Sequence, residues 1–104
     1  MRVLDHEPHA WFLLEEGGAL YLDAFCSHSF LDYSVTIALD QQERAAYAAA
    51  GRSFLDALAT QIHESAPAAP GSRSPYRARD LIGAHDFVAA RATQAILAWR
   101  AKQA

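Results

Sequence analysis

The sequence predicts an α+β fold, in which an antiparallel meander of three or four strands packs against two helices on one of its faces. Three observations predict it. A Gly17-Gly18 pair separates two apolar runs, residues 31–39 alternate between large apolar and small or polar side chains, and apolar residues recur every three or four positions after residue 41. The 104 residues are expected to form a single domain, 1–104.

The first hairpin is predicted by the glycine pair, because two-residue turns between strands require positive φ at their central residues. A turn at Gly17-Gly18 fixes the register of the two strands. The expected opposing pairs are Glu16–Ala19, Leu14–Tyr21, Leu13–Leu22, Phe12–Asp23 and Trp11–Ala24.

The remaining strands follow from alternation and from a short polar break. Residues 31–39 predict a half-buried third strand, and Ser27-His28-Ser29-Phe30 is expected to turn the chain before it. The strands thus occupy about residues 10–39. Val3 and Leu4 are candidates for a fourth strand at the edge.

Two helices are expected after the strands. Asp40 and Glu43 have the spacing of a capping box, and the helix that they begin should run over about 41–64. Gly51 lies within its apolar stripe, which predicts a close approach to the sheet. A proline-containing loop is predicted over 65–80. A second helix is predicted over about 84–102, with one apolar face formed by Val88, Ala92, Ala95, Ile96 and Trp99.

Composition excludes several classes of protein. A hydrophobic fraction of 52% and a charged fraction of 20% are not those of a disordered chain. A lone cysteine, Cys26, excludes a disulfide scaffold. No apolar run approaches the roughly 18 residues of a membrane span, and the N-terminus lacks the apolar core of a signal peptide. We therefore expect a reduced, cytoplasmic protein that does not enter a membrane.

Charge is unevenly distributed along the chain. Residues 1–43 hold eight acidic residues and one arginine, whereas residues 73–104 hold six basic residues and two acidic ones. These charges can neutralise each other within the fold or be offered to a partner. A pI near 5.9 argues against nucleic acid as that partner.

The predicted sheet has apolar side chains on both faces. One face holds residues expected to point into the core: Trp11, Leu13, Leu22, Ala24, Cys26, Tyr33, Val35 and Ile37. The other holds the candidate binding residues Phe12, Leu14, Tyr21, Asp23, Phe25 and Asp32. Aromatic side chains beside carboxylates favour an interface with a protein partner or a second copy. The alternative is that a terminal segment or the proline-containing loop covers this face.

Two further groups of residues carry possible ligand chemistry. His6, His9, Cys26 and His28 are weak candidates for a tetrahedral zinc site, but their spacing is not that of a known motif, and a buried thiol with loop histidines is favoured. Arg73, Arg77 and Arg79 could form an anion-binding loop. Pairing of these arginines with the acidic strands or with Asp80 is favoured instead.

No residues with the spacing of a known catalytic or cofactor-binding motif are present, so neither a catalytic group nor a cofactor is predicted. We expect a small non-enzymatic binding protein that acts by protein–protein contact. A small, acidic chain of bacterial appearance with an aromatic and acidic face is similar in kind to immunity proteins, which neutralise a toxin by direct contact. The alternatives are a metal-binding protein and a homo-oligomeric subunit.

Overall fold

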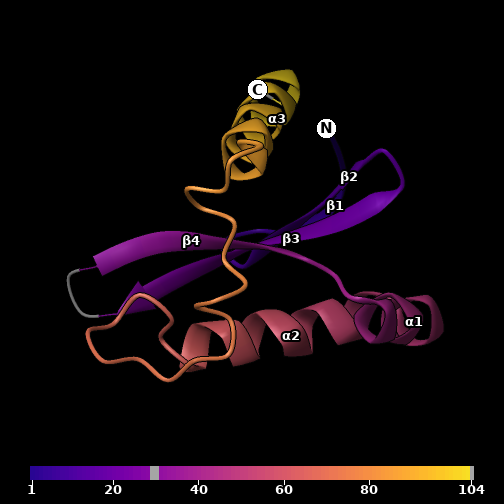
Figure 1. The fold of residues 1–104 in the computed structure, drawn as a ribbon. Coiled ribbons are helices and arrows are strands. Elements are labelled where there is room, and N and C mark those ends of the chain that lie inside the picture. Colours follow the sequence, from indigo (N-terminus) through magenta and orange to yellow (C-terminus); the bar gives the residue numbers. More distant parts are fainter. Residues whose placement is uncertain (29–30, 104) are drawn as a thin grey trace.

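The computed structural model describes residues 1–28 and 31–103, and its sheet is a four-stranded antiparallel meander. The strands are β1 (Arg2–Glu7), β2 (Trp11–Glu16), β3 (Ala19–His28) and β4 (Leu31–Ala38), which lie side by side in chain order (Figure 1). The predicted α+β class is thereby confirmed, with the N-terminal residues as the fourth strand.

The β2–β3 register is the predicted one in all the pairs from Glu16–Ala19 to Trp11–Ala24. Its cause is the turn, where Gly17 and Gly18 adopt φ values of 58° and 84°. Of the turn expected over 27–30, residues 29 and 30 lie outside the described part of the chain. Ser27 and His28 belong to β3, where they pair with Asp32 and Leu31 of β4.

The structure contains the helices α1 (Gln41–Ala50), α2 (Arg52–Glu64) and α3 (Val88–Gln103). The capping box is confirmed: Glu43 N donates to Asp40 Oδ1 at 2.8 Å, and Asp40 N donates to Glu43 Oε1 at 2.9 Å. The helix expected over 41–64 is interrupted at Gly51, whose φ of 66° and ψ of −140° are not helical. The predicted close approach of Gly51 to the sheet is wrong, because a Cβ there would meet nothing within 4 Å.

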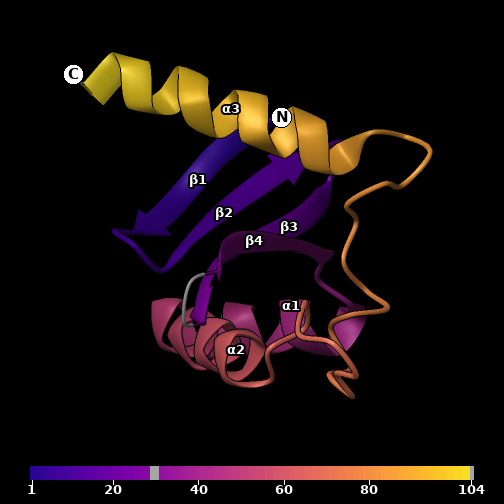
Figure 2. The ribbon, with the colours of Figure 1, turned by 90° about the vertical axis from the view of Figure 1, so that its left-hand side faces the viewer.

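The helices occupy both faces of the sheet (Figures 1 and 2). α1 and α2 lie against one face and α3 lies across the other. In this respect the structure differs from the expected arrangement, which placed both predicted helices on one face. The reason is that consecutive residues of β2, such as Leu13 and Leu14, are apolar and point to opposite faces, so that each face needs a cover.

The face under α1 and α2 carries the larger core. Its buried strand residues are Trp11, Leu13, Leu22, Ala24, Cys26, Val35 and Ile37, with Tyr33 packed against them. This is the set that alternation predicts to point inward. Leu55, Leu58 and Ile62 of α2 complete the core from the helical side.

The face under α3 carries a smaller core, formed by Phe12, Leu14, Ala92 and Ile96. The apolar stripe predicted for the second helix is confirmed, since Val88, Ala92 and Ile96 are buried and Ala95 and Trp99 pack beside them. The helix begins at Val88 instead of residue 84, because Gly83 and Phe87 have positive φ.

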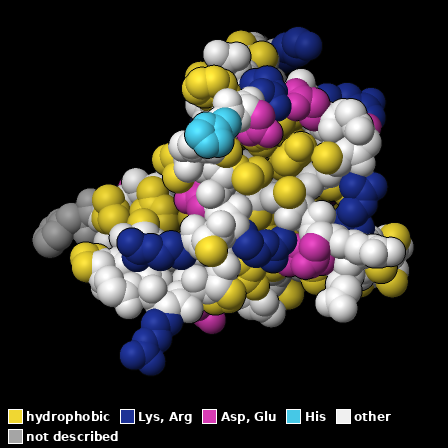
Figure 3. All heavy atoms as spheres, viewed as in Figure 1, with side chains coloured by type: hydrophobic (Ala, Val, Ile, Leu, Met, Phe, Trp, Pro, Cys, Tyr) yellow, Lys and Arg dark blue, Asp and Glu magenta, His cyan; other side chains and the backbone are white. Residues whose placement is uncertain are grey.

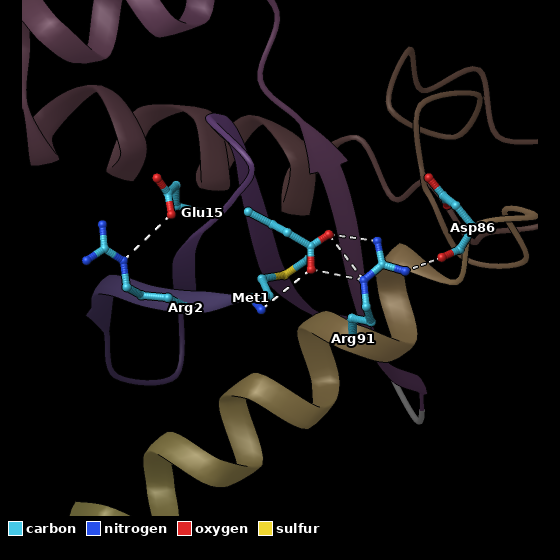
Figure 4. A network of polar contacts seen from close by, with 6 residues as sticks. Met1, Arg2, Glu15, Asp86 and Arg91 are labelled. Carbon is cyan, nitrogen blue, oxygen red and sulfur yellow. Dashed lines mark hydrogen bonds and ion pairs between the residues drawn. The ribbon is translucent and has the colours of Figure 1, made fainter.

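A network of hydrogen bonds and ion pairs connects the first turn of α3 to the β2–β3 hairpin (Figure 4). Arg91 Nη2 lies 2.7 Å from Glu16 Oε1, and Arg91 Nη1 donates to the Asp86 carbonyl oxygen. The N-terminal amine of Met1 lies 3.5 Å from Glu16 Oε2. The hydrogen bonds from Arg91 hold the pKa of the Glu16 carboxyl below its ordinary value. The network therefore joins the N-terminus, the hairpin and α3.

The segment between α2 and α3 passes the outer edge of β4 as it crosses from one layer to the other (Figure 2). Leu81 N donates to Thr36 O at 2.8 Å, and Thr36 N donates to Asp80 Oδ1 at 3.3 Å. These bonds satisfy strand groups that would otherwise form an open edge. Within residues 1–28 and 31–103, no helix has both the length and the apolar character needed to cross a bilayer.

Candidate functional site

α3 covers much of the sheet face that the sequence marks as a binding surface. Leu14 is fully buried, Phe12 and Asp23 are nearly so, and Tyr21 is partly buried. The sequence leaves two alternatives for this face: an open binding surface, or a face covered by a terminal segment. For these four residues the open surface is wrong, because the C-terminal helix α3 covers them. Phe25 and Asp32 remain exposed.

A pocket of about 230 Å³ remains where α3 crosses the sheet, and we call it the Asp23 pocket. Alternation along β2 and β3 brings Phe12, Asp23 and Phe25 to the same face, and α3 adds its own side chains at helical spacing. The residues that give the pocket its chemistry are Phe12, Asp23, Phe25, Ser34, Leu97 and Arg100.

Asp23 is the buried acid of this pocket, with 8% of its surface exposed. Thr36 Oγ1, directly across the strand pair, donates to Asp23 Oδ2 at 2.9 Å. Burial raises the pKa of Asp23, and the nearby Asp80 raises it further, against the lowering effects of hydrogen bonds from Thr36 and Ser34 and of the charge on Arg100. None of the ion pairs formed by the described residues involves Asp23.

The raised pKa of Asp23 carries a cost for folding. Because the folded protein holds this proton more tightly than the unfolded chain, the unfolding free energy falls as pH rises from the ordinary aspartate pKa to the raised one. Above that range the folded protein bears the full cost of a buried, ionised carboxylate.

Arg100 lies on the α3 side of the pocket, above an aromatic cluster. Its guanidinium carbon is 5.3 Å from the centre of the Phe12 ring. The Phe12 ring in turn meets Trp99 edge-on, with centroids 5.5 Å apart, and stacks on His6 at 5.3 Å. The cluster thus positions a cation at a pocket whose other wall holds the buried carboxylate.

Exposed apolar side chains lie beside the pocket, on α3 and in the segment that precedes it. Ile82, Phe87 and Leu97 are 72%, 71% and 58% exposed. A second hollow of about 320 Å³ is lined by Ile82, Phe87, Ala90 and Thr93, and Thr93 also lines the Asp23 pocket. Residues 90, 93, 97 and 100 share one face of the helix, next to its buried stripe. We call Ile82, Phe87, Ala90, Thr93 and Leu97 the α3 strip.

Hydrophobic side chains also reach the surface between α3 and the sheet on the face that Figure 3 presents. Neither the α3 strip nor Arg100 is predicted as a site by the sequence. A usable signal was present in Leu97, which is a large apolar residue off the buried stripe of its helix, and in Ile82 and Phe87, which lie in a stretch otherwise rich in turn-forming residues.

The four candidate metal ligands are not brought together. His6 packs on the α3 side, 4.4 Å from the Trp99 ring, whereas Cys26 is buried in the core on the opposite face. His9 is exposed in the turn after β1, and His28 stacks on His63 at 4.6 Å. Over residues 1–28 and 31–103, no group of three or more His, Cys, Asp or Glu residues could hold a metal ion. Burial raises the pKa of the Cys26 thiol to about 11.

The three loop arginines do not converge on one site. Arg79 forms two hydrogen bonds with the Glu43 carboxylate, of 2.5 and 2.9 Å, and they hold the pKa of Glu43 below its ordinary value. Arg77 Nη1 donates to Ala69 O at 3.0 Å, and Arg73 is exposed. Arg79 therefore pairs with an acid of the same protein, as the favoured interpretation expects. Its partner, Glu43, lies in α1 and not in the sheet.

The acidic first third of the chain is largely neutralised in the same way. Arg52 pairs with both Asp5 and Glu7, and Arg2 lies 3.7 Å from Glu15. With Glu16 bound to Arg91 and Glu43 bound to Arg79, five of the eight acids have an arginine partner. The uneven charge along the sequence therefore mostly cancels within the fold.

No protein-family model matches this sequence, and no curated protein or solved structure is significantly similar to it.

Proposed function

We propose that this chain is a small non-enzymatic binding protein that acts through contact with another protein, and that the α3 strip is its contact surface. The observation that carries this proposal is Phe87, a large aromatic residue that is exposed and has a φ of 57°. Neither property helps the chain to fold.

Phe87 has an unfavourable backbone and gains little from burial. Bulky side chains rarely adopt positive φ, and such outliers gather at functional sites. Its carbonyl oxygen accepts the first helical hydrogen bond of α3, from Arg91 N at 3.0 Å, which makes Phe87 the N-cap residue. That position favours Asn, Asp or Ser. A phenylalanine here is therefore better explained by binding than by folding.

The chemistry of the strip indicates an apolar partner surface. Interface cores are poor in charge and use aromatic residues as anchors. Ile82, Phe87 and Leu97 fit this description, while most acids of the first third are engaged by the protein's own arginines. The partner is expected to present an apolar patch of its own, and a toxin neutralised by contact is the partner class suggested by the small size and the exposed aromatic residue.

The cytoplasm is the compartment that we propose for this contact. The lone cysteine is buried, and its raised pKa keeps the thiol protonated and unreactive. The protein therefore needs no oxidising environment to complete its structure.

Phe87→Asn tests the proposal through two measurements. Asparagine tolerates positive φ and caps helices well, so the free energy of unfolding is expected to rise by about 0.5–1 kcal/mol in urea denaturation. Capture of the partner from a lysate of the source cells is expected to be lost. Leu4→Asn is the matched control, because Leu4 is also an exposed apolar residue, 41% exposed, but lies on β1.

Two results would contradict the proposal. One is a Phe87→Asn protein that is less stable than wild type and captures the same partner. The other is a wild-type protein that forms a dimer in light scattering and becomes a monomer on Phe87→Asn. In that case the α3 strip would join two copies of the chain, and the protein would be a homo-oligomer instead of a protein that binds a different partner.

A further inference from the structure

The Asp23 pocket has a feature that the proposed protein contact does not use. Asp23 is more than nine-tenths buried and lines a cavity, yet no cationic side chain of the described residues forms an ion pair with it. Buried carboxylates are normally paired with a cation or bound to a metal. The hydroxyl of Thr36, at 2.9 Å, and that of Ser34 supply only neutral hydrogen bonds. The arrangement leaves a place for a positive group from outside the chain.

The opposite side of the same pocket offers the complementary charge. Arg100 lines it from α3, and its guanidinium is held over the Phe12 ring. A guanidinium pairs with a carboxylate through two parallel hydrogen bonds, which gives direction as well as attraction. The rest of the lining is mixed: Phe12, Phe25 and Leu97 supply apolar surface, and His9, Ser34 and Thr93 supply polar atoms.

We propose that the Asp23 pocket binds a small zwitterion with an apolar body, an aliphatic α-amino acid. Asp23 receives the ammonium group, Arg100 receives the carboxylate, and Phe12, Phe25 and Leu97 surround the side chain. This inference goes beyond the proposed protein contact. The pocket shares Thr93 and Leu97 with the α3 strip, but Asp23 and Arg100, the two charged groups that would bind the ligand, are not part of the strip.

The volume of the pocket fits such a ligand. An apolar cavity of about 150 Å³ accommodates benzene. In proportion, a pocket of about 230 Å³ has room for about nine non-hydrogen atoms, which is the size of leucine.

The charges of the pocket disfavour other small ligands. A simple anion would be repelled by Asp23, and a simple cation would be repelled by Arg100. A divalent metal would find one carboxylate where it needs several ligands, in agreement with the lack of any metal-binding group over residues 1–28 and 31–103.

Calorimetric titration with three matched compounds tests the proposal. L-leucine carries both charges, 3-methylbutylamine lacks the carboxylate and 4-methylpentanoate lacks the ammonium group. Near neutral pH the wild-type protein is expected to bind leucine at least about tenfold more tightly than either of the other two. An equal affinity for leucine and the amine would contradict the proposal, as would heat from no compound at millimolar concentration.

Two variants separate the roles of the charged groups. Asp23→Asn should lose about tenfold or more in leucine affinity, while the thermal midpoint of the ligand-free protein stays equal or rises because a buried charge is removed. The affinity of Arg100→Gln for leucine should be no higher than the affinity of the wild-type protein for 3-methylbutylamine. Asp32→Asn and Arg73→Gln, which alter exposed charges elsewhere, should bind leucine as wild type does.

The controls show whether a loss of leucine affinity is caused by the change in the pocket. A large fall in the midpoint of ligand-free Asp23→Asn would assign the carboxylate to the fold and overturn the proposal. An equal loss of leucine affinity in Asp32→Asn or Arg73→Gln would also overturn it. If Asp23→Asn fails to fold, the proposal is tested by the leucine affinity of Arg100→Gln and by NMR of the wild-type protein. Addition of leucine should shift the NMR signals of Phe25 and Leu97, and unchanged signals would contradict the proposal.

Discussion

Leu14→Ala is expected to lower the free energy of unfolding by about 2–5 kcal/mol. Leu14 is fully buried in the core between the sheet and α3, where it clusters with Phe12, Ala92 and Ile96. Truncation to alanine removes apolar area and leaves a cavity that the helix on one side and the sheet on the other can only partly close. Urea denaturation monitored by circular dichroism measures the effect.

Leu4→Ala is the control for this measurement. Leu4 lies on the neighbouring strand β1 but is 41% exposed. Its truncation should change the free energy of unfolding by no more than about 0.5 kcal/mol, the usual effect of a surface substitution. Equal and small losses for the two variants would mean that the second face of the sheet is open, against the placement of α3.

Gly51→Ala is expected to lower the free energy of unfolding by about 1–3 kcal/mol. Gly51 joins α1 to α2 with a φ of 66° and a ψ of −140°, a conformation that side chains with a Cβ rarely adopt. The cost comes from the backbone and not from a clash, because a Cβ at this position would meet nothing within 4 Å.

The sign of the Gly51→Ala effect distinguishes two structures. Within one continuous helix over 41–64, alanine would stabilise the protein by about 1 kcal/mol relative to glycine. Ala45→Gly, at an exposed position inside α1, provides the reference and should cost about 1 kcal/mol. A gain in stability for Gly51→Ala would contradict the break between α1 and α2.

Local interactions explain which parts of the fold could be predicted from sequence. The hairpin register depends only on the Gly17-Gly18 turn, and the start of α1 depends on two residues three positions apart. The interruption at Gly51 could not be predicted in the same way, because glycine within a helical pattern is compatible with a continuous helix at modest cost.

The position of α3 depends on interactions that periodicity does not contain. The stripe of Val88, Ala92 and Ile96 shows which side of the helix is apolar, but not which face of the sheet it covers. Phe12 and Leu14 were the available signal, because large apolar side chains on a second face need a cover. The sequence supports that inference only as one of two alternatives.

The candidate site could be predicted in part for the same reason. Phe12, Asp23 and Phe25 share one face through simple strand alternation, and the sequence places them together. Arg100 and Leu97 join them only through the folding of α3 over the sheet, and no spacing rule connects residues so far apart in the chain. The pairing of Arg52 with Asp5 could not be predicted either, because the two residues are 47 positions apart in the sequence.

Nuclear Overhauser contacts of the Trp99 ring test whether α3 lies across the sheet at the Asp23 pocket. Contacts to the rings of His6 and Phe12 are expected, since the ring centroids are 4.4 and 5.5 Å from that of Trp99. Contacts between β3 and α2 side chains of the opposite core, which includes Leu22 and Leu55, serve as the internal control. Absence of the Trp99 contacts while the control contacts are present would contradict the placement of α3, and with it both the strip and the pocket.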